Sequence, residues 1–398
     1  MELLHRFPRL SSERIPLDDS LSRRLSEDVV AFEDLPEQSR STVDGYAVRA
    51  EDTFGASDAI PALLEVIEPV TMGTIPPFTL SSGQAAPIPT GGFLPQGADA
   101  VVMVEYTNPA GANSVEVMRP VTLLSNVLGK GEDSQAGDPL ITKGEQLRFQ
   151  EIGYLAASGF SEVPVYGKPK IGILSSGDEI VPIDQKPSPG QIRDANGHAL
   201  AALVRKVGAD PILFDIIPDK AEKLQEALLS ALSQCDVIVI SGGSSVGTRD
   251  VMKDAVSSLD DTEILAHGLT IRPGKPTLLA QRNDKAIFGL PGHPVSALIV
   301  AQVFLAPFLN YLQGDELRKG PQGRRIHAIL NSAIHSTIGL EEYMRIKIEE
   351  NADGTCKAYP VYGKSGMLST LVKADGILVI PLSMEGYSKG ENVTVTLL

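Results

Sequence analysis

The chain has 398 residues, 42% hydrophobic and 21% charged, a composition typical of a globular protein large enough for two to four domains. Its formal net charge of −15 argues against nucleic acid or an anionic membrane as the main partner, because both need a basic face. A small anionic ligand remains compatible with this charge, since backbone N–H groups and a few local cations can hold one.

Residues 11–33 include LDDSLSRRLSEDV, whose helical period predicts an amphipathic helix followed by a strand. Between residues 45 and 125, short apolar runs alternate with Gly/Pro turns, which indicates a β-rich insertion. The stretch FQEIGYLAASGF (149–160) resumes a helical pattern. We therefore expect a discontinuous mixed α/β domain (1–40 and 125–167) that carries a β-rich inserted domain (41–124).

From Pro169 onward, strands alternate with helices. The expected order is a strand at KIGILSSGDE, a helix from 196 to 207 ended by Gly208, a strand at PILFDII, a helix from 219 to 232, and a strand at DVIVI. This alternation predicts a three-layer α/β domain with a parallel-type sheet over residues 168–316. From about residue 322 the chain is β-rich again, which predicts a C-terminal β-barrel-like domain (322–398).

The cysteines and the longest apolar stretch bear on location. Cys235 and Cys356 keep no metal-ligand spacing, so we expect two thiols in a reducing compartment. The N-terminus has no apolar core of a secretory signal. Gln302 and Pro307 interrupt the apolar stretch 297–312, which we interpret as a core helix kinked or broken at Pro307. A cytoplasmic protein without membrane contact is expected.

Two loops fall at the carboxyl ends of predicted parallel strands, where such sheets place their ligands: SSGDE (175–179) and SGGSSVGTRD (241–250). Glycines in the second loop let backbone N–H groups approach an anion, although a Gly/Ser turn between strand and helix can also be purely structural. The loop matches neither the dinucleotide fingerprint nor the Walker pattern.

Asp219 and Asp250 stand at predicted helix starts, and two interpretations are open. Each can cap its helix, and Glu222 lies three residues after Asp219 in capping-box spacing. Each can also hold Mg²⁺ against a phosphate, because Mg²⁺ prefers one or two carboxylates together with phosphate oxygens and water. Glu179 is equally ambiguous.

Arg272 and Lys275 bracket a Pro-Gly turn in RPGKP, and in an acidic protein an anion is their natural partner. Pro294 suits the first turn of the helix that follows GLPGHP. We interpret His293 as a cap or packing residue, because no second His or Cys keeps metal-ligand spacing with it. The sequence shows no pattern for a Ser/His/Asp or Cys/His nucleophile.

Taken together, an ordered series of motifs covers nearly the whole chain. It consists of LSRRLSEDVVAFEDLPEQSRSTVDGYAV, IPTGGFLPQGADAVVMVE, GEDSQAGDPLITKGEQL, ILSSGDEI, GQIRDANGHAL, SGGSSVGTRD, RPGKP, GLPGHPVSA and PVYGKSGMLSTLVKADGILVIP. In this order, the series resembles the molybdopterin molybdenumtransferase (MoeA) family, whose eukaryotic relatives include the last domain of gephyrin.

The resemblance implies an enzyme that binds adenylylated molybdopterin, inserts molybdate at its dithiolene and releases AMP with the help of Mg²⁺. It also implies an elongated homodimer. The cleft would lie between the α/β domain of one subunit and the second and fourth domains of the other. The molybdopterin adenylyltransferase is an expected further partner. Tungstate is close to molybdate in size and charge and stays the alternative substrate.

The resemblance also implies two sets of site residues. The catalytic set is Asp44, Thr90, Glu179, Asp219, Asp250, Arg272 and Lys275, with Glu179, Asp219 and Asp250 as metal ligands. The cofactor-binding set is Ser175, Ser176, Gly177, Asp194, Asn196, Ser241, Gly242, Gly243, Ser244, Ser245, Gly247, Pro273, Gly274, Pro291, Gly292, His293, Pro294, Lys364 and Ser365.

The chain departs from the family pattern at four positions: Val43 in place of Met, Arg272 and Gly268 in place of Lys, and His293 in place of Asn. The last three touch the expected oxyanion pocket. Three other functions compete with metal insertion: molybdopterin adenylyltransferase, nucleotide pyrophosphatase and scaffold. A lone α/β domain would suffice for the first two, so the motifs around Asp44 and Thr90 and the tail domain speak against them. A scaffold would be expected to carry an appended interaction region.

Overall fold

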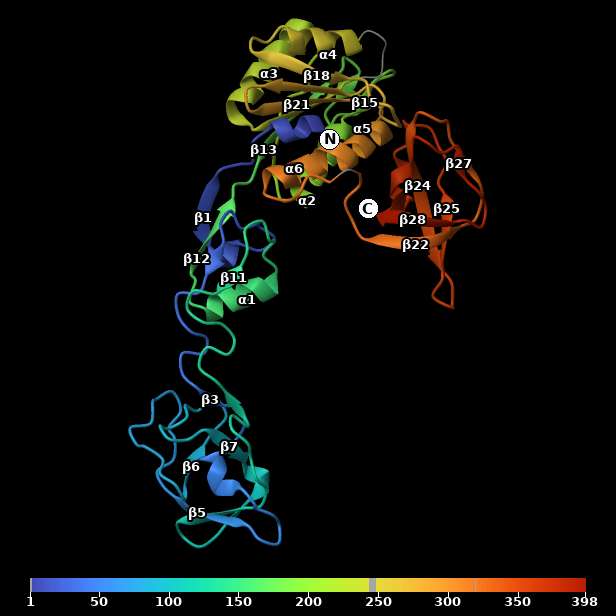
Figure 1. The fold of residues 1–398 in the computed structure, drawn as a ribbon. Helices are drawn as coiled ribbons and strands as arrows, with labels where there is room; N and C mark the ends of the chain where they lie inside the picture. The colour runs from blue at the N-terminus through green and yellow to red at the C-terminus, as the bar shows by residue number, and fades with distance from the viewer. Residues whose placement is uncertain (1, 243–247, 319) are drawn as a thin grey trace. The chain divides into compact units, whose positions relative to one another are not determined.

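The structure is a computed structural model that describes residues 2–242, 248–318 and 320–398 (Figure 1). Its contacts divide the chain into two units. The first unit comprises Met1–Arg14, Ser22–Ser26 and Pro164–Leu398, and the second comprises Ile15–Leu21 and Glu27–Val163. The strands β1 (Ser12–Pro16) and β12 (Glu162–Tyr166) pair with each other.

A six-stranded sheet forms the α/β part of the first unit. Its order is β16 (Asp210–Leu213), β13 (Lys170–Ser176), β17 (Val237–Gly242), β21 (Lys285–Leu290), β20 (Leu278–Arg282) and β18 (Thr262–His267). The first four strands run parallel, while β20 is antiparallel to both of its neighbours. The predicted parallel-type sheet is therefore confirmed, with an antiparallel edge added to it.

Apolar side chains of the central strands point alternately to the two faces of the sheet, so a hydrophobic core forms on each face. Ile171 and Ile173 pack with α2 (Ala195–Lys206) in one core, whereas Ile238 and Ile240 pack with α3 (Ala221–Gln234) in the other. The second core also receives side chains from α4 (Thr248–Ser257), and Figure 1 shows α3 and α4 on the same side of the sheet. Helices thus cover both faces, as the strand–helix alternation predicts.

The apolar stretch expected to be a core helix is continuous from Pro294 to Leu312, through α5 (Pro294–Val300), a π-helical segment (Ala301–Leu305) and α6 (Ala306–Leu312). Among the described residues this one helix is long and apolar enough to cross a membrane, but 72% of its apolar window is buried inside the protein. Of the two expectations at Pro307, a kink or a break, the break is wrong, because the helix continues through this residue. The π-helical segment just before Pro307 accommodates a residue that lacks an N–H donor.

The C-terminal part of the first unit is a closed barrel, which confirms the predicted β-barrel-like domain. Its ring is β24 (Glu341–Glu350), β25 (Cys356–Pro360), β22 (Arg325–Leu330), β28 (Asn392–Leu397) and β26 (Gly376–Ile380), closed by pairing between β26 and β24. The short strand β19 (Ile271–Arg272) pairs in parallel with β24, so the backbone of the RPGKP turn is tied to the barrel. Smaller elements complete the first unit: β14 (Ile180–Val181), β15 (Ile192–Arg193), β23 (Ile334–His335), β27 (Gly386–Tyr387), α7 (Ser369–Val372) and the N-terminal turn Glu2–Arg6.

The second unit is β-rich around a six-stranded sheet in the order β7 (Ala100–Met103), β4 (Gly45–Val48), β6 (Gln84–Ile88), β5 (Ala62–Val66), β9 (Ser114–Val117) and β8 (Thr107–Pro109). Two small sheets pair β2 (Val29–Val30) with β11 (Pro139–Ile141) and β3 (Arg40–Ser41) with β10 (Val127–Leu128). The helix predicted within 149–160 is confirmed as α1 (Phe149–Ala157). Single turns lie at Leu17–Asp19, Ala50–Thr53 and Val104–Tyr106.

The amphipathic helix predicted from LDDSLSRRLSEDV is wrong. This segment is one 3₁₀ turn at Leu17–Asp19 followed by irregular backbone with Ser22 at φ 66°. Tertiary bonds replace the helical ones: the backbone of Ser26 donates to Pro164, and the Arg23 guanidinium donates to the Tyr166 carbonyl at 2.6 Å. Packing against another segment has overridden a helical period.

Candidate active site

The carboxyl ends of three parallel strands lie side by side, as the positions of SSGDE and SGGSSVGTRD require. Ser175 at the end of β13 is level with Ser241 of β17, which is level with Leu290 of β21. Parallel strands open their carboxyl ends toward one edge, where ligands bind outside the sheet. Ser175, Ser241 and Leu290 therefore lie together at that edge.

Side-chain hydrogen bonds hold this edge together. Asp194 caps α2 by accepting from the Gly197 backbone at 2.9 Å, and its other oxygen accepts from the Ser175 hydroxyl at 2.8 Å. The Asn196 amide donates to the Ser241 hydroxyl at 2.7 Å and to the Gly292 carbonyl at 2.8 Å. These predicted cofactor-binding residues thus lie close together and brace the loops.

Asp219 does not cap α3, which excludes one of its two interpretations. The residue before the helix is Lys220, which makes no capping bond, whereas Asp219 accepts from the Ser176 hydroxyl at 3.0 Å. Partial burial raises the pKa of the Asp219 carboxyl, and the neighbouring Glu179 and Asp178 carboxylates raise it further. Three carboxyl groups therefore gather beside the end of β13, an arrangement that a cation would stabilise.

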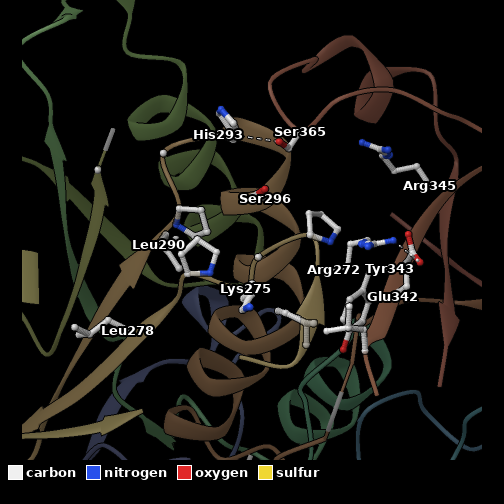
Figure 2. A pocket seen from close by; sticks show the side chains of 18 of the residues that line it. Arg272, Lys275, Leu278, Leu290, His293, Ser296, Glu342, Tyr343, Arg345 and Ser365 are labelled. Carbon is white, nitrogen blue, oxygen red and sulfur yellow. Dashed lines mark hydrogen bonds and ion pairs between the residues drawn. The ribbon is translucent and has the colours of Figure 1, made fainter. Parts of the chain in front are cut away.

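Beside this edge, a cavity of about 660 Å³ lies between the α/β sheet and the barrel (Figure 2). Residues from both parts line it: Gly242, Met252, His267, Ile271, Arg272, Pro273, Gly274, Lys275, Pro276, Leu278, Leu290, Pro291, Gly292, His293, Ser296, Leu340, Glu342, Tyr343, Met344, Arg345, Gly363 and Ser365. The size is that of a small-molecule site.

Gly274 shapes the RPGKP turn at the rim of the cavity. Its φ is +113°, and a Cβ at this position would lie 2.4 Å from Cγ2 of Val300. Only glycine lets the turn pack against α5 in this conformation. The turn in this way directs Arg272 and Lys275 toward the cavity.

Three cations line the cavity in a chain that is acidic as a whole. Arg272 is 53% exposed and lies 3.8 Å from Glu342, which is held by the Ser336 hydroxyl. Lys275 is exposed and has no ion-pair partner among residues 2–242, 248–318 and 320–398. Arg345 is 9% exposed, and its Nε is buried without a partner in the part of the chain that the structure describes.

Arg345 is held in place by two neutral groups. Nη1 donates to the Thr370 hydroxyl at 3.1 Å and Nη2 to the Gly363 carbonyl at 3.2 Å. Burial lowers the pKa of its guanidinium, although Glu342 partly compensates. A largely buried guanidinium that lines a cavity and whose hydrogen-bond acceptors are neutral favours an anionic ligand.

His293 occupies the N-cap position of α5, as the cap interpretation expects, but its side chain makes no capping hydrogen bond. Its Nδ1 instead lies 2.7 Å from the Ser365 hydroxyl (Figure 2). Pro294 occupies the first turn of α5, as predicted.

The structure brings nine predicted residues to the cavity: Gly242, Arg272, Pro273, Gly274, Lys275, Pro291, Gly292, His293 and Ser365. The remaining predicted residues of the first unit whose side chains are described are outside the lining: Ser175, Ser176, Gly177, Glu179, Asp194, Asn196, Asp219, Ser241, Pro294 and Lys364. Gly243, Ser244, Ser245 and Gly247 lie outside the described residues, as does the side chain of Asp250, whose backbone is in the first turn of α4.

Two predicted catalytic residues belong to the second unit and contact each other there. The backbone and hydroxyl of Thr90 donate to the same Asp44 oxygen at 2.7 and 3.0 Å. These bonds lower the pKa of the Asp44 carboxyl. A Cβ on Gly45 would lie 1.9 Å from the Val102 carbonyl oxygen, so the glycine permits the strand pairing that presents Asp44.

The same chain provides the barrel residues of the cavity, and the contribution of a partner subunit's domains stays a prediction. Sequence reasoning missed Glu342 and Arg345 among them. Both lie in EEYMRIKIEE, which reads as an ordinary charged strand. The burial of its first six residues, including Arg345, arises only when the barrel closes and meets the α/β part.

Comparison with known proteins matches almost all of the sequence. Residues 1–159 match the family described as MoeA N-terminal region (domain I and II), 172–311 the "Probable molybdopterin binding domain", and 327–398 the MoeA C-terminal region (domain IV). A molybdopterin molybdenumtransferase from Nostoc is 36% identical over 397 residues, covering 98% of this chain and 90% of the relative. The chain belongs to the MoeA family.

Other MoeA relatives agree with this assignment. A molybdopterin molybdenumtransferase from Bacillus subtilis is 32% identical over 391 residues, 97% of this chain and 90% of the relative. The crystal structure of a molybdopterin biosynthesis MoeA protein from Pyrococcus horikoshii superposes with a TM-score of 0.85 at 34% identity, covering 100% of this chain and 97% of that one. The MoeA fold therefore extends over the whole chain.

Proposed function

We propose that this MoeA protein inserts molybdate into adenylylated molybdopterin, with Mg²⁺, and releases AMP. The observation that carries the proposal is the cavity in which Arg272, Lys275 and Arg345 converge beside the carboxyl edge of the sheet. Relatives named molybdopterin molybdenumtransferase support the transferase activity. The molybdopterin substrate class is supported by the family that matches residues 172–311.

The cavity suits an oxyanion such as molybdate because it combines one fixed cation with two exposed ones. Arg345 is buried and held by neutral groups, so it provides a fixed donor, while Lys275 and Arg272 are exposed and can close on a ligand. Hydrogen bonds from charged donors to an oxyanion are among the strong ones in proteins. We assign molybdate to this group of three residues, with tungstate as the alternative of equal charge.

The carboxyl cluster beside β13 is suited to Mg²⁺. Asp219 and Glu179 are the ligands we propose, and the raised pKa of Asp219 reflects the mutual repulsion and burial that a cation would relieve. No group of three or more His, Cys, Asp or Glu in ligand geometry exists among the described residues, but Mg²⁺ is commonly held by one or two carboxylates with water and phosphate. Bound there, Mg²⁺ would neutralise the oxygens of the phosphoanhydride.

The phosphoanhydride is then cleaved by water, which yields AMP and leaves the terminal phosphate on the pterin. Such a step needs positioning and charge neutralisation more than a covalent nucleophile. We propose that Ser176 orients Asp219 through its hydroxyl and that the segment 241–247 holds the pterin phosphate. We propose Asp250 as a third carboxylate ligand of Mg²⁺. We also propose that Asp44 and Thr90 of the β-rich unit contribute to the catalytic site.

Molybdopterin adenylyltransferase, pyrophosphatase and scaffold are the competing functions. The matches of residues 1–159 and 327–398 to the two MoeA-specific regions favour metal insertion, because the first two activities need only the α/β part. We also propose the homodimer, contact with the adenylyltransferase, a cytoplasmic location and the four-domain division given above.

The test is AMP release from adenylylated molybdopterin by the purified protein with Mg²⁺, with and without molybdate or tungstate. Release that depends on the oxyanion is the expected result, and the more effective oxyanion identifies the substrate. Release that ignores the oxyanion would make the protein a pyrophosphatase. Tight binding with no release would make it a carrier or scaffold.

A further inference from the structure

The hydrogen bond between Ser365 and His293 joins the barrel to the α/β part at the lining of the cavity. The Ser365 hydroxyl lies 2.7 Å from Nδ1 of His293, and the Ser365 carbonyl accepts from the Val295 backbone at 3.0 Å. Figure 2 shows the first of these bonds at the cavity beside Ser296, across from Arg345. The start of α5 therefore holds both the backbone and the hydroxyl of Ser365.

Two arrangements of protons satisfy this bond. If Nδ1 is unprotonated, the Ser365 hydroxyl must donate to it and has no proton left for a ligand. If Nδ1 carries the proton, the ring donates to the serine oxygen, and the hydroxyl proton is free to turn into the cavity. A deprotonated oxyanion accepts hydrogen bonds but donates none, so only the second arrangement lets Ser365 bind it.

The surroundings favour the second arrangement once an anion is present. The charged groups that line the cavity with His293 are Arg272, Lys275 and Arg345, opposed by Glu342, and Lys364 is the neighbour of Ser365 in the chain. These cations draw an oxyanion toward the Ser365 hydroxyl. The His293 ring is exposed, so exchange with water can move its proton from one nitrogen to the other.

We propose that His293 is a positioning residue for oxyanion binding: in the molybdate-bound protein its Nδ1 is protonated and turns Ser365 into a donor to the anion. The inference rests on the proposed function, because it needs molybdate in this cavity. His293 acts through Ser365 and need not touch the oxyanion.

The direct test is nitrogen NMR of the full-length protein with ¹⁵N-labelled histidine, saturated with molybdate at pH 8, where imidazoles are ordinarily neutral. The His293 signals are identified by their loss in the His293→Asn variant. We expect Nδ1 to show the shift of a protonated nitrogen and Nε2 that of an unprotonated one. The reverse assignment in the saturated protein would overturn the proposal.

A double-mutant cycle tests the route through Ser365. We expect His293→Leu to weaken molybdate binding by about tenfold, as loss of one charge-assisted hydrogen bond predicts. His293→Asn should stay within about threefold of the wild type, since its amide can still donate to the serine oxygen. In the Ser365→Ala background, His293→Leu should add no further loss.

His335→Leu is the matched control, because His335 is an exposed histidine of the barrel outside the cavity lining. Equal losses from His293→Leu with and without the Ser365 hydroxyl would refute a role through Ser365. Unchanged molybdate binding in His293→Leu would refute the role of His293 and leave the anion site intact. Absence of molybdate binding in the wild type would instead refute the proposed site itself.

Discussion

Replacing Arg345 by methionine tests the anion site at its most buried cation. Methionine keeps much of the length and packing of the arginine side chain but removes its charge and donors. Arg345 lines the cavity and is only 9% exposed, which places a charged guanidinium at the cavity with little competing water. The substitution therefore removes binding interactions without opening a large hole.

The expected loss follows from one charged hydrogen bond to the oxyanion. Such a bond contributes about 1.5–3 kcal/mol. Because about 1.4 kcal/mol corresponds to a tenfold change, molybdate binding should weaken by roughly 10- to 150-fold. The same variant loses the bonds to Thr370 and Gly363, so the free energy of unfolding should fall by about 1–3 kcal/mol.

Calorimetric titration with molybdate and the molybdate dependence of AMP release measure the effect. Thr370→Val is the matched control, because it removes one of the same structural bonds but leaves the guanidinium in place. Arg345→Lys should be intermediate, since it keeps a charge but loses the planar donor group. Molybdate affinity in Arg345→Met within threefold of the Thr370→Val value would refute the assignment of the oxyanion to this cavity.

Three further substitutions test other parts of the structure. Asp219→Asn should lower Mg²⁺-dependent AMP release at least tenfold. Its thermal stability at pH 7 should not fall, because the raised pKa of Asp219 means that the charged carboxylate destabilises the folded protein. Gly274→Ala should cost about 2–5 kcal/mol in the free energy of unfolding, from positive φ and the clash with Val300. As the pH falls from about 4.5 to 2, the free energy of unfolding should decline less in Glu151→Gln than in the wild type.

The sign for Glu151 follows from its environment. The Arg148 guanidinium lowers the pKa of this carboxyl to about 2, so its contribution is complete above the ordinary glutamate pKa and is lost as pH falls through the folded value. The glutamine amide can still accept from the Arg148 backbone, so the helix cap survives in the variant. Parallel acid-denaturation curves for the two proteins would contradict this explanation.

The Asp219 and Gly274 predictions also have outcomes that would contradict them. A loss of AMP release in Asp219→Asn that more Mg²⁺ cannot reverse, together with a lower melting temperature, would point to a structural role for Asp219. Gly274→Ser should destabilise at least as much as Gly274→Ala, because both place a Cβ against Val300. A variant at Gly274 with unchanged stability would mean that the turn can move away from α5.

Local sequence patterns predicted the elements correctly where the spacing of apolar residues along one segment matches the face that the segment buries. The strand–helix alternation after Pro169 predicted the sheet with its two covered faces, and the period in 149–160 predicted α1. The same kind of period failed in residues 17–29, because backbone bonds of that segment go to residues 161–166 and to β11. A periodic pattern shows which side chains prefer burial, but another segment decides the backbone that buries them.

By itself, the sequence determined the strand–helix alternation after Pro169, the placement of two motifs at strand ends and the motifs that mark the MoeA family, because these depend on neighbours along the chain. Only the tertiary structure brought Arg345 and Ser365 of the barrel to Lys275 and His293 of the α/β part. It also separated Asp219 from helix capping. The physical reason is that burial and distance, which give a charge or a hydroxyl its chemistry, are properties of segments that meet only in the folded chain.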